Sequence, residues 1–137
     1  MRQVHLTIFI LVSATIGAGY YCEAKSAPES IVVENAEIRL VVPNAPTKIS
    51  VSIFVHNKSS ETLSIQGFSS VCGKGCCIWQ LEPLPLELPP RQRTEFRCEL
   101  QITLPGEFHI APEMYLRDCG GTRAVAIDIS GTATGGS

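Results

Sequence analysis

Hydrophobic and polar residues alternate with a period of two along most of the chain after residue 30. In residues 48–56, for example, Ile49, Val51 and Ile53 are separated by serine residues. Such alternation is typical of strands that bury one face. Turn residues interrupt it about every dozen positions, and no helical period of useful length follows the N-terminal segment. The pattern therefore predicts an all-β domain.

The segments that show this alternation are the strands that we expect. They are residues 31–42, which hold one or two strands, and residues 48–56, 61–68, 93–104, 107–117 and 122–132.

Other segments depart from regular alternation. Residues 71–79 contain three cysteines and are expected to form an irregular loop. Residues 81–90 contain four prolines, which cannot donate to a sheet ladder, so we expect an edge strand or a loop there. Pro112 lies on the apolar face of its segment and predicts a bulge or a kink. Residues 118–121 predict a hairpin turn, because adjacent glycines accept positive φ.

About seven short strands in a domain of about 100 residues are typical of two stacked antiparallel sheets. The sequence therefore predicts an immunoglobulin-like antiparallel β-sandwich after an N-terminal signal helix. We place the domain at residues 31–132, between a flexible leader at 25–30 and a flexible tail at 133–137. The residues expected in the core lie on the apolar faces of their strands: Ile53, Ile65, Phe96, Phe108 and Ile127.

The N-terminus has the layout of a secretory signal peptide. Arg2 supplies a positive charge, residues 6–16 are mostly apolar, and small residues follow at 17–19. We assign residues 1–24 to the signal peptide and expect an exported protein, in the periplasm, the cell envelope or the extracellular space. The apolar run is shorter than the ~20 residues that span a bilayer, so we expect no membrane insertion after cleavage. The alternative is an uncleaved signal anchor.

The charge of the chain argues against a nucleic-acid partner. The formal net charge of the 137 residues is −2, and a phosphate-binding surface needs clustered Lys and Arg. The nearest approach to such a cluster, at Arg91, Arg93 and Arg97, is interrupted by Glu95. We therefore expect no nucleic-acid binding.

Export would place the cysteines in an oxidising compartment, where thiols tend to pair. The chain has six cysteines, and loss of Cys22 with the signal peptide leaves an odd number. The odd thiol is then free, bound to a metal or paired with a second chain. The expected strand directions place Cys119 at the end of the domain opposite the other turn cysteines. We therefore expect Cys119 to be the odd thiol.

Cys72, Cys76 and Cys77 lie within six residues of one another. Cys72 most simply closes a small loop with Cys76 or with Cys77, whereas a bridge between the adjacent Cys76 and Cys77 strains the peptide between them. Cys98 lies on the inward face of its strand, so it is either a plain buried thiol or the partner of one of these three. The alternative is that the three thiolates bind a soft cation such as Cu(I) or Zn²⁺, or act in redox chemistry.

No residue pattern predicts catalysis or a cofactor. Nucleophilic catalysis needs a Ser or Cys beside a His base and a carboxylate, and His56 and His109 are expected at the surface, before a turn and on an outward strand face. Asn57 begins an Asn-Lys-Ser sequon, which we interpret as an ordinary turn asparagine. We expect Trp79 to anchor the cysteine loop on the core; the alternative is a place in a binding surface.

A set of short motifs spans most of residues 33–131: Phe54-Val55-His56-Asn57, Leu63-Ser64-Ile65, Ser70-Val71-Cys72-Gly73, Pro89-Pro90, Gly106-Glu107-Phe108 and Ile129-Ser130-Gly131. In these motifs the chain resembles an exported bacterial domain family of unknown function, a distant relative of the immunoglobulin-like sandwiches in hydin-type and major-sperm-protein-type modules. The resemblance implies the sandwich fold and no established activity. The family's loop usually reads Cys-Gly-Cys, whereas this chain has a longer loop with an additional thiol.

We therefore expect a non-enzymatic exported module that binds or scaffolds another, unidentified protein. The alternative is a thiolate metal-handling or redox module centred on Cys72, Cys76 and Cys77.

Overall fold

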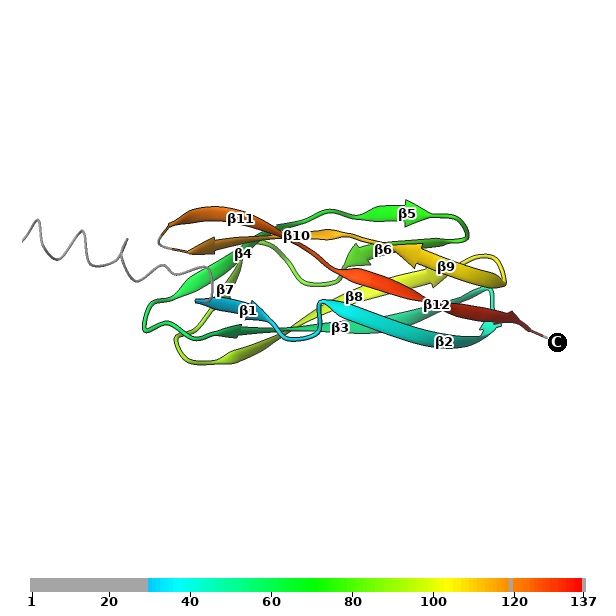
Figure 1. Ribbon diagram of the computed structural model, residues 1–137, viewed down its shortest axis with the longest axis horizontal. Coiled ribbons are helices and arrows are strands. Elements are labelled where there is room, and N and C mark those ends of the chain that lie inside the picture. The colour runs from blue at the N-terminus through cyan, green and yellow to red at the C-terminus, as the bar shows by residue number, and fades with distance from the viewer. Residues whose placement is uncertain (1–29, 119, 137) are drawn as a thin grey trace, which may run out of the picture.

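The computed structural model describes residues 30–118 and 120–136. This part of the chain forms twelve β-strands and no helix, as Figure 1 shows. The strands are β1 (Ile31–Val33), β2 (Glu37–Ala45), β3 (Thr47–Asn57), β4 (Leu63–Phe68), β5 (Val71–Gly73), β6 (Cys76–Gln80), β7 (Leu86–Leu88), β8 (Arg93–Ile102), β9 (Gly106–Ile110), β10 (Glu113–Asp118), β11 (Gly121–Ala126) and β12 (Asp128–Gly135). The all-β prediction is confirmed.

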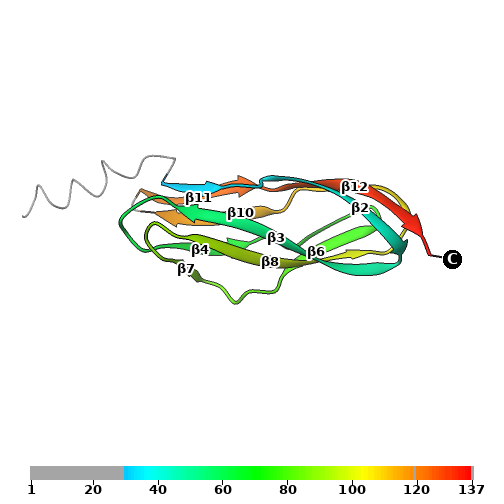
Figure 2. The ribbon, with the colours of Figure 1, turned by 90° about the horizontal axis from the view of Figure 1, so that it is seen from below.

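The strands form three sheets that are arranged as two layers. One layer is a five-stranded sheet in the order β1-β3-β8-β6-β5. The other consists of a four-stranded sheet, β11-β10-β4-β7, and a three-stranded sheet, β2-β12-β9. These two lie end to end, because the chain runs from β9 into β10 and from β11 into β12 without reversing (Figures 1 and 2). The predicted immunoglobulin-like sandwich is confirmed.

The core lies between the layers and consists of the inward-facing residues of both. All five residues predicted for it are buried: Ile53, Ile65, Phe96, Phe108 and Ile127. The rings of Phe96 and Phe68, which come from opposite layers, have centroids 5.3 Å apart. The strand phases derived from the alternation are therefore correct.

The segments predicted as single strands at 107–117 and 122–132 each form two strands in different sheets. The breaks fall at Pro112 and at Ile127, where the amide of Ile127 donates to the carbonyl of Pro112 over 2.8 Å. Buried residues occupy the even positions on both sides of Pro112. The alternation thus continues through the break and conceals the change of sheet. These two breaks, together with the short strands β5, β6 and β7, make the predicted number of strands, about seven, too small.

One strand pair departs from the predicted antiparallel arrangement. Strand β2 pairs with β12 in parallel. It lies in the same sheet as β12, and the chain then crosses to β3 in the other layer. Strand β12 runs to Gly135, beyond the domain end predicted at residue 132. Ser30, predicted in the leader, is buried and donates to Asp118 over 3.2 Å.

The prediction of an irregular loop at residues 71–79 is wrong, because these residues form the β5–β6 hairpin. Gly75 has a φ of 75°, which a turn requires and which glycine adopts without strain. Gly75 therefore marks a hairpin turn within this segment. The proline-rich stretch contains the short strand β7 at the edge of its sheet, as predicted.

No helix in the described ranges is long and apolar enough to cross a membrane. The predicted signal peptide at 1–24, most of the predicted leader, and Cys22 and Cys119 lie outside those ranges. The β5–β6 turn lies at the end of the molecule where the described chain ends, and strands β10 and β11 meet at the opposite end (Figure 1).

Candidate functional site

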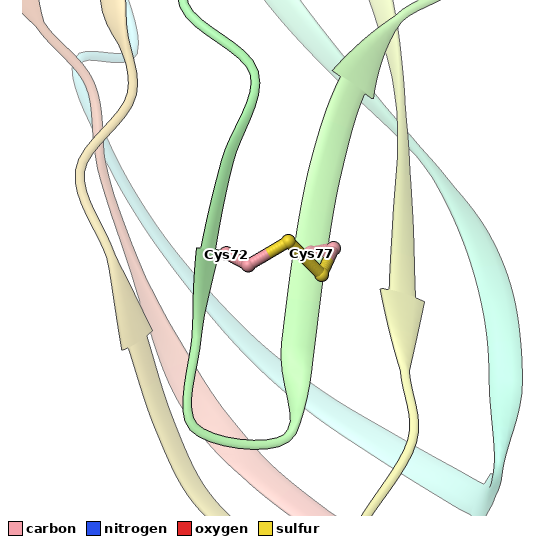
Figure 3. The surroundings of a disulfide bond; sticks show 2 residues. All are labelled: Cys72 and Cys77. Carbon is pink, nitrogen blue, oxygen red and sulfur yellow. A yellow bond between two sulfur atoms is a disulfide. The ribbon is translucent and has the colours of Figure 1, made fainter.

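A disulfide bond joins the two strands of the β5–β6 hairpin. Cys72 and Cys77 lie directly opposite each other in the ladder and are bonded (Figure 3). This is one of the two small loops that the sequence predicted for Cys72. Cys72 is exposed and Cys77 is half-buried, so the bond lies on the outer surface of the five-stranded sheet.

The hairpin also closes the seam between the two layers. A Cβ atom at Gly73 would lie 2.9 Å from both the carbonyl oxygen of His109 and the Cγ2 of Ile110, so only glycine permits this close approach to β9. At the turn, the carbonyl of Gly75 accepts a 2.8 Å hydrogen bond from the amide of Thr103. The disulfide-linked hairpin is thus packed against β9 and bonded to the residue that follows β8.

Two cysteines of the described chain, Cys76 and Cys98, carry free thiols, and both are buried. The alternative bond from Cys98 to the turn cysteines is therefore not formed. Burial raises the pKa of Cys98 to about 12, with a smaller contribution from the charge of Glu82. Burial also raises the pKa of Cys76, and a backbone hydrogen bond at Gly73 opposes this. Both thiols are consequently protonated at neutral pH, and thiols in that state are poor nucleophiles and ligands.

The three neighbouring cysteines do not converge on one point. Successive side chains of a strand point to opposite faces, so Cys76 faces the core while Cys77 faces outward with Cys72. Among residues 30–118 and 120–136, no group of three His, Cys, Asp or Glu side chains is placed to hold a metal ion. In the oxidised hairpin the thiolate ligand set of the metal hypothesis is therefore not assembled.

The outer face of the five-stranded sheet is covered by ion pairs between its own strands and loops. The pairs that combine Arg or Lys with Glu are Arg93–Glu34 at 2.7 Å, Arg97–Glu82 at 2.7 Å and Lys48–Glu99 at 3.9 Å. The guanidinium of Arg93 also lies 4.0 Å from the ring centroid of Phe54. This face offers few unpaired groups to a ligand.

Trp79 belongs to this outer face. It is half-buried, and the Nζ of Lys48 lies 5.9 Å from the centroid of its ring. The prediction that Trp79 anchors the cysteine loop on the core is wrong, because the inward position of β6 next to it is taken by Ile78.

The outer face of the three-stranded sheet, in contrast, contains a shallow groove of about 450 Å³. Side chains and backbone of β2, β9 and β12 line it: Arg39, Glu107, Phe108, His109, Ser130, Gly131 and Thr132. The Nε2 of His109 lies 2.6 Å from a carboxylate oxygen of Asp128, and Arg39 pairs with Glu37 at 2.9 Å. His109 is exposed, as expected from its outward position.

Several groups of this groove have no partner within the described chain. The carboxylate of Glu107 and the hydroxyls of Ser130 and Thr132 make no side-chain hydrogen bond or ion pair to any residue of 30–118 or 120–136. Val41, directly beside Thr132 in the sheet, is 85% exposed. Sequence reasoning missed this groove, because its residues come from three separate strands and each shows only an ordinary outward position.

No protein-family model matches the chain, and no curated protein matches it in sequence. Its fold, however, is similar to that of solved structures. The PapD-like domain 7 of human CEP192 superposes with a TM-score of 0.62 at 10% identity, over 79% of this chain and 87% of that domain. The fold is thus an immunoglobulin-like sandwich similar to that of this PapD-like domain.

Two further solved structures have a similar fold. A protein of unknown function from Porphyromonas gingivalis W83 has a TM-score of 0.61 at 14% identity, over 77% of this chain and 48% of that one. The periplasmic chaperone SfaE has a TM-score of 0.51 at 12% identity, over 77% of this chain and 58% of that one. The chain thus spans less than two thirds of both proteins, and at these identities the likeness concerns the fold alone. The sequence resemblance to a bacterial family of unknown function has no family-model support.

Proposed function

We propose that this protein is an exported, non-enzymatic module that binds another protein through the outer face of its three-stranded sheet. The observation that carries the proposal is the groove of about 450 Å³, in which Glu107, Ser130 and Thr132 have no partner within the described chain. Protein interfaces combine apolar contact area with polar groups that a partner satisfies, and the exposed Val41 beside the groove supplies the first of these.

The two faces of the sandwich support this choice by their contrast. On the five-stranded sheet the charged side chains are paired with one another, so a partner would have to break those pairs. The three-stranded sheet also has ion pairs, at Arg39 and His109. Beside them a partner meets Glu107, Ser130 and Thr132, which are unpaired within the described chain, and satisfying these groups removes no internal interaction.

Export is proposed on two further observations. The N-terminal sequence has the layout of a signal peptide, and the domain contains the Cys72–Cys77 disulfide. Disulfides form and persist outside the reducing cytosol. A similar fold occurs in the periplasmic chaperone SfaE.

A photocrosslinking side chain tests the binding face. It is placed at Thr132 in the groove and, as a matched control, at Ser50, an exposed hydroxyl residue on the outer face of the five-stranded sheet. We expect a discrete crosslinked protein from the exported fraction at Thr132 and none at Ser50. The same crosslinks at both positions, or at Ser50 alone, would refute the assignment of the face.

A further inference from the structure

We propose that the Cys72–Cys77 disulfide holds strand β5 over the Cys76 thiol, so that reduction of this bond opens Cys76 to covalent modification. The hairpin is then a redox-sensitive cover for a third cysteine. This inference is independent of the proposed binding face.

Besides its ladder with β6 and the close approach of Gly73 to β9, strand β5 has few interactions that hold it in place. It consists of three residues, lies at the edge of the five-stranded sheet and pairs only with β6. Of its residues, Val71 is half-buried, and Cys72 and Gly73 are exposed. Segments with little buried apolar surface open locally at low cost in free energy. The disulfide is the covalent link that keeps this strand on β6.

The same strand covers the sulfur of Cys76. Gly73 lies directly opposite Cys76 in the ladder, and a Cβ atom at Gly73 would lie 3.6 Å from the Sγ of Cys76. Cys76 is only 1% exposed. Movement of β5 away from β6 removes the backbone of Gly73 from this position and admits solvent from the edge of the sheet.

Cys98 provides an internal control, because it is equally buried for a different reason. It is 0% exposed and lies in β8, which has β3 on one side and β6 on the other. Release of β5 leaves both neighbours of β8 in place. A local opening therefore exposes Cys76 and leaves Cys98 covered.

The redox step needs an external dithiol. A thiolate of the dithiol attacks a sulfur of the Cys72–Cys77 bond, and its second thiol then displaces the protein sulfur from the mixed disulfide. Two electrons and two protons pass from the dithiol to the protein, which gains two thiols while the dithiol becomes a cyclic disulfide. The exposed Cys72 is the accessible side for this attack. Once uncovered, the Cys76 sulfur displaces iodide from iodoacetamide and releases its proton to solvent.

The test compares alkylation rates of Cys76 and Cys98 by iodoacetamide under native conditions. Trypsin separates the cysteines, because cleavage after Lys74, Arg91, Arg97 and Arg117 yields peptides 75–91 and 98–117. In the double variant Cys72→Ser/Cys77→Ser, peptide 75–91 contains Cys76 alone. The wild-type protein, with and without dithiothreitol, gives a second measurement in which fragmentation of the peptide distinguishes Cys76 from Cys77.

We expect alkylation of Cys76 to be roughly 10- to 100-fold faster in the double variant and in the reduced protein than in the oxidised protein. This range follows from the loop entropy of a cross-link between residues separated by five positions. The rate at Cys98 is expected to stay constant. Cys76 remaining as protected as Cys98 would overturn the proposal. Equal acceleration at both cysteines would also overturn it, since the disulfide would then support the whole sandwich and not strand β5.

Discussion

Replacement of Asn57 by Ala tests whether the turn after β3 depends on one buried amide. Asn57 is 0% exposed. Its Nδ2 donates to the carbonyls of Glu61 over 2.7 Å and Leu88 over 2.9 Å, and its Oδ1 accepts from the amide and the hydroxyl of Ser59. One side chain thus joins the β3–β4 turn to the end of β7.

The substitution leaves two carbonyl acceptors without their donor, one of them in a buried bond. An unsatisfied buried polar group costs about 1–3 kcal/mol, so we expect the free energy of unfolding to fall by about 2–4 kcal/mol. With a typical dependence of the free energy of unfolding on urea concentration, the urea midpoint of unfolding then falls by roughly 1–3 M. Urea unfolding followed by the fluorescence of Trp79, the single tryptophan, measures this.

Gln66→Ala is the matched control. Its amide also makes a hydrogen bond, to the hydroxyl of Ser64, but it lies on an exposed face. Surface substitutions of this kind change stability by about 0.5 kcal/mol or less. If Asn57→Ala costs no more than Gln66→Ala, the buried hydrogen bonds of Asn57 do not stabilise the fold.

The burial of Asn57 also predicts that the folded protein is not glycosylated at its Asn-Lys-Ser sequon. A glycan would be attached to the Nδ2 atom, which donates to the carbonyls of Glu61 and Leu88.

Three other predictions concern the core, the hairpin and pH. Phe96→Ala should lower the free energy of unfolding by about 3–5 kcal/mol, and a loss below about 1 kcal/mol in urea would contradict its burial. Gly73→Ala should cost about 1–3 kcal/mol through overpacking against β9, whereas Gly135→Ala, whose Cβ would meet only Pro105 at 3.7 Å, should change little. Burial raises the pKa of Cys98 to about 12 in the folded protein. Above pH ~9 the thiol therefore deprotonates in the unfolded state while it stays protonated in the folded state, and the free energy of unfolding falls as pH rises. Cys98→Ala should remove this part of the pH dependence, and an unchanged alkaline slope would contradict it.

The alternation of apolar residues was sufficient to predict the all-β class and the core. Phe96 and Ile127 were assigned to the interior from sequence alone, and both are fully buried. Which side chains of a strand face the core is set by their alternation along that strand. A single sequence therefore reveals it.

Sheet membership and the groove could not be predicted in the same way. The change of sheet at Pro112 leaves the phase of burial unaltered, and the β5–β6 hairpin depends on contacts of Gly73 with β9, far away in sequence. The groove depends on the register that places Ser130 opposite both His109 and Arg39. Pairing between distant strands is not encoded in any one segment.

The binding face is tested by the affinity of the crosslinked partner for two charge-reversal variants. Glu107→Lys alters the groove, and Glu87→Lys alters an exposed glutamate of β7 in another sheet. A contact with Glu107 implies a loss of at least about tenfold in affinity, since interfacial charge pairs are worth about 1.5 kcal/mol or more. We therefore expect a weakened complex for Glu107→Lys and an unchanged dissociation constant for Glu87→Lys. An unchanged dissociation constant for Glu107→Lys would contradict the assignment of this face as the binding surface.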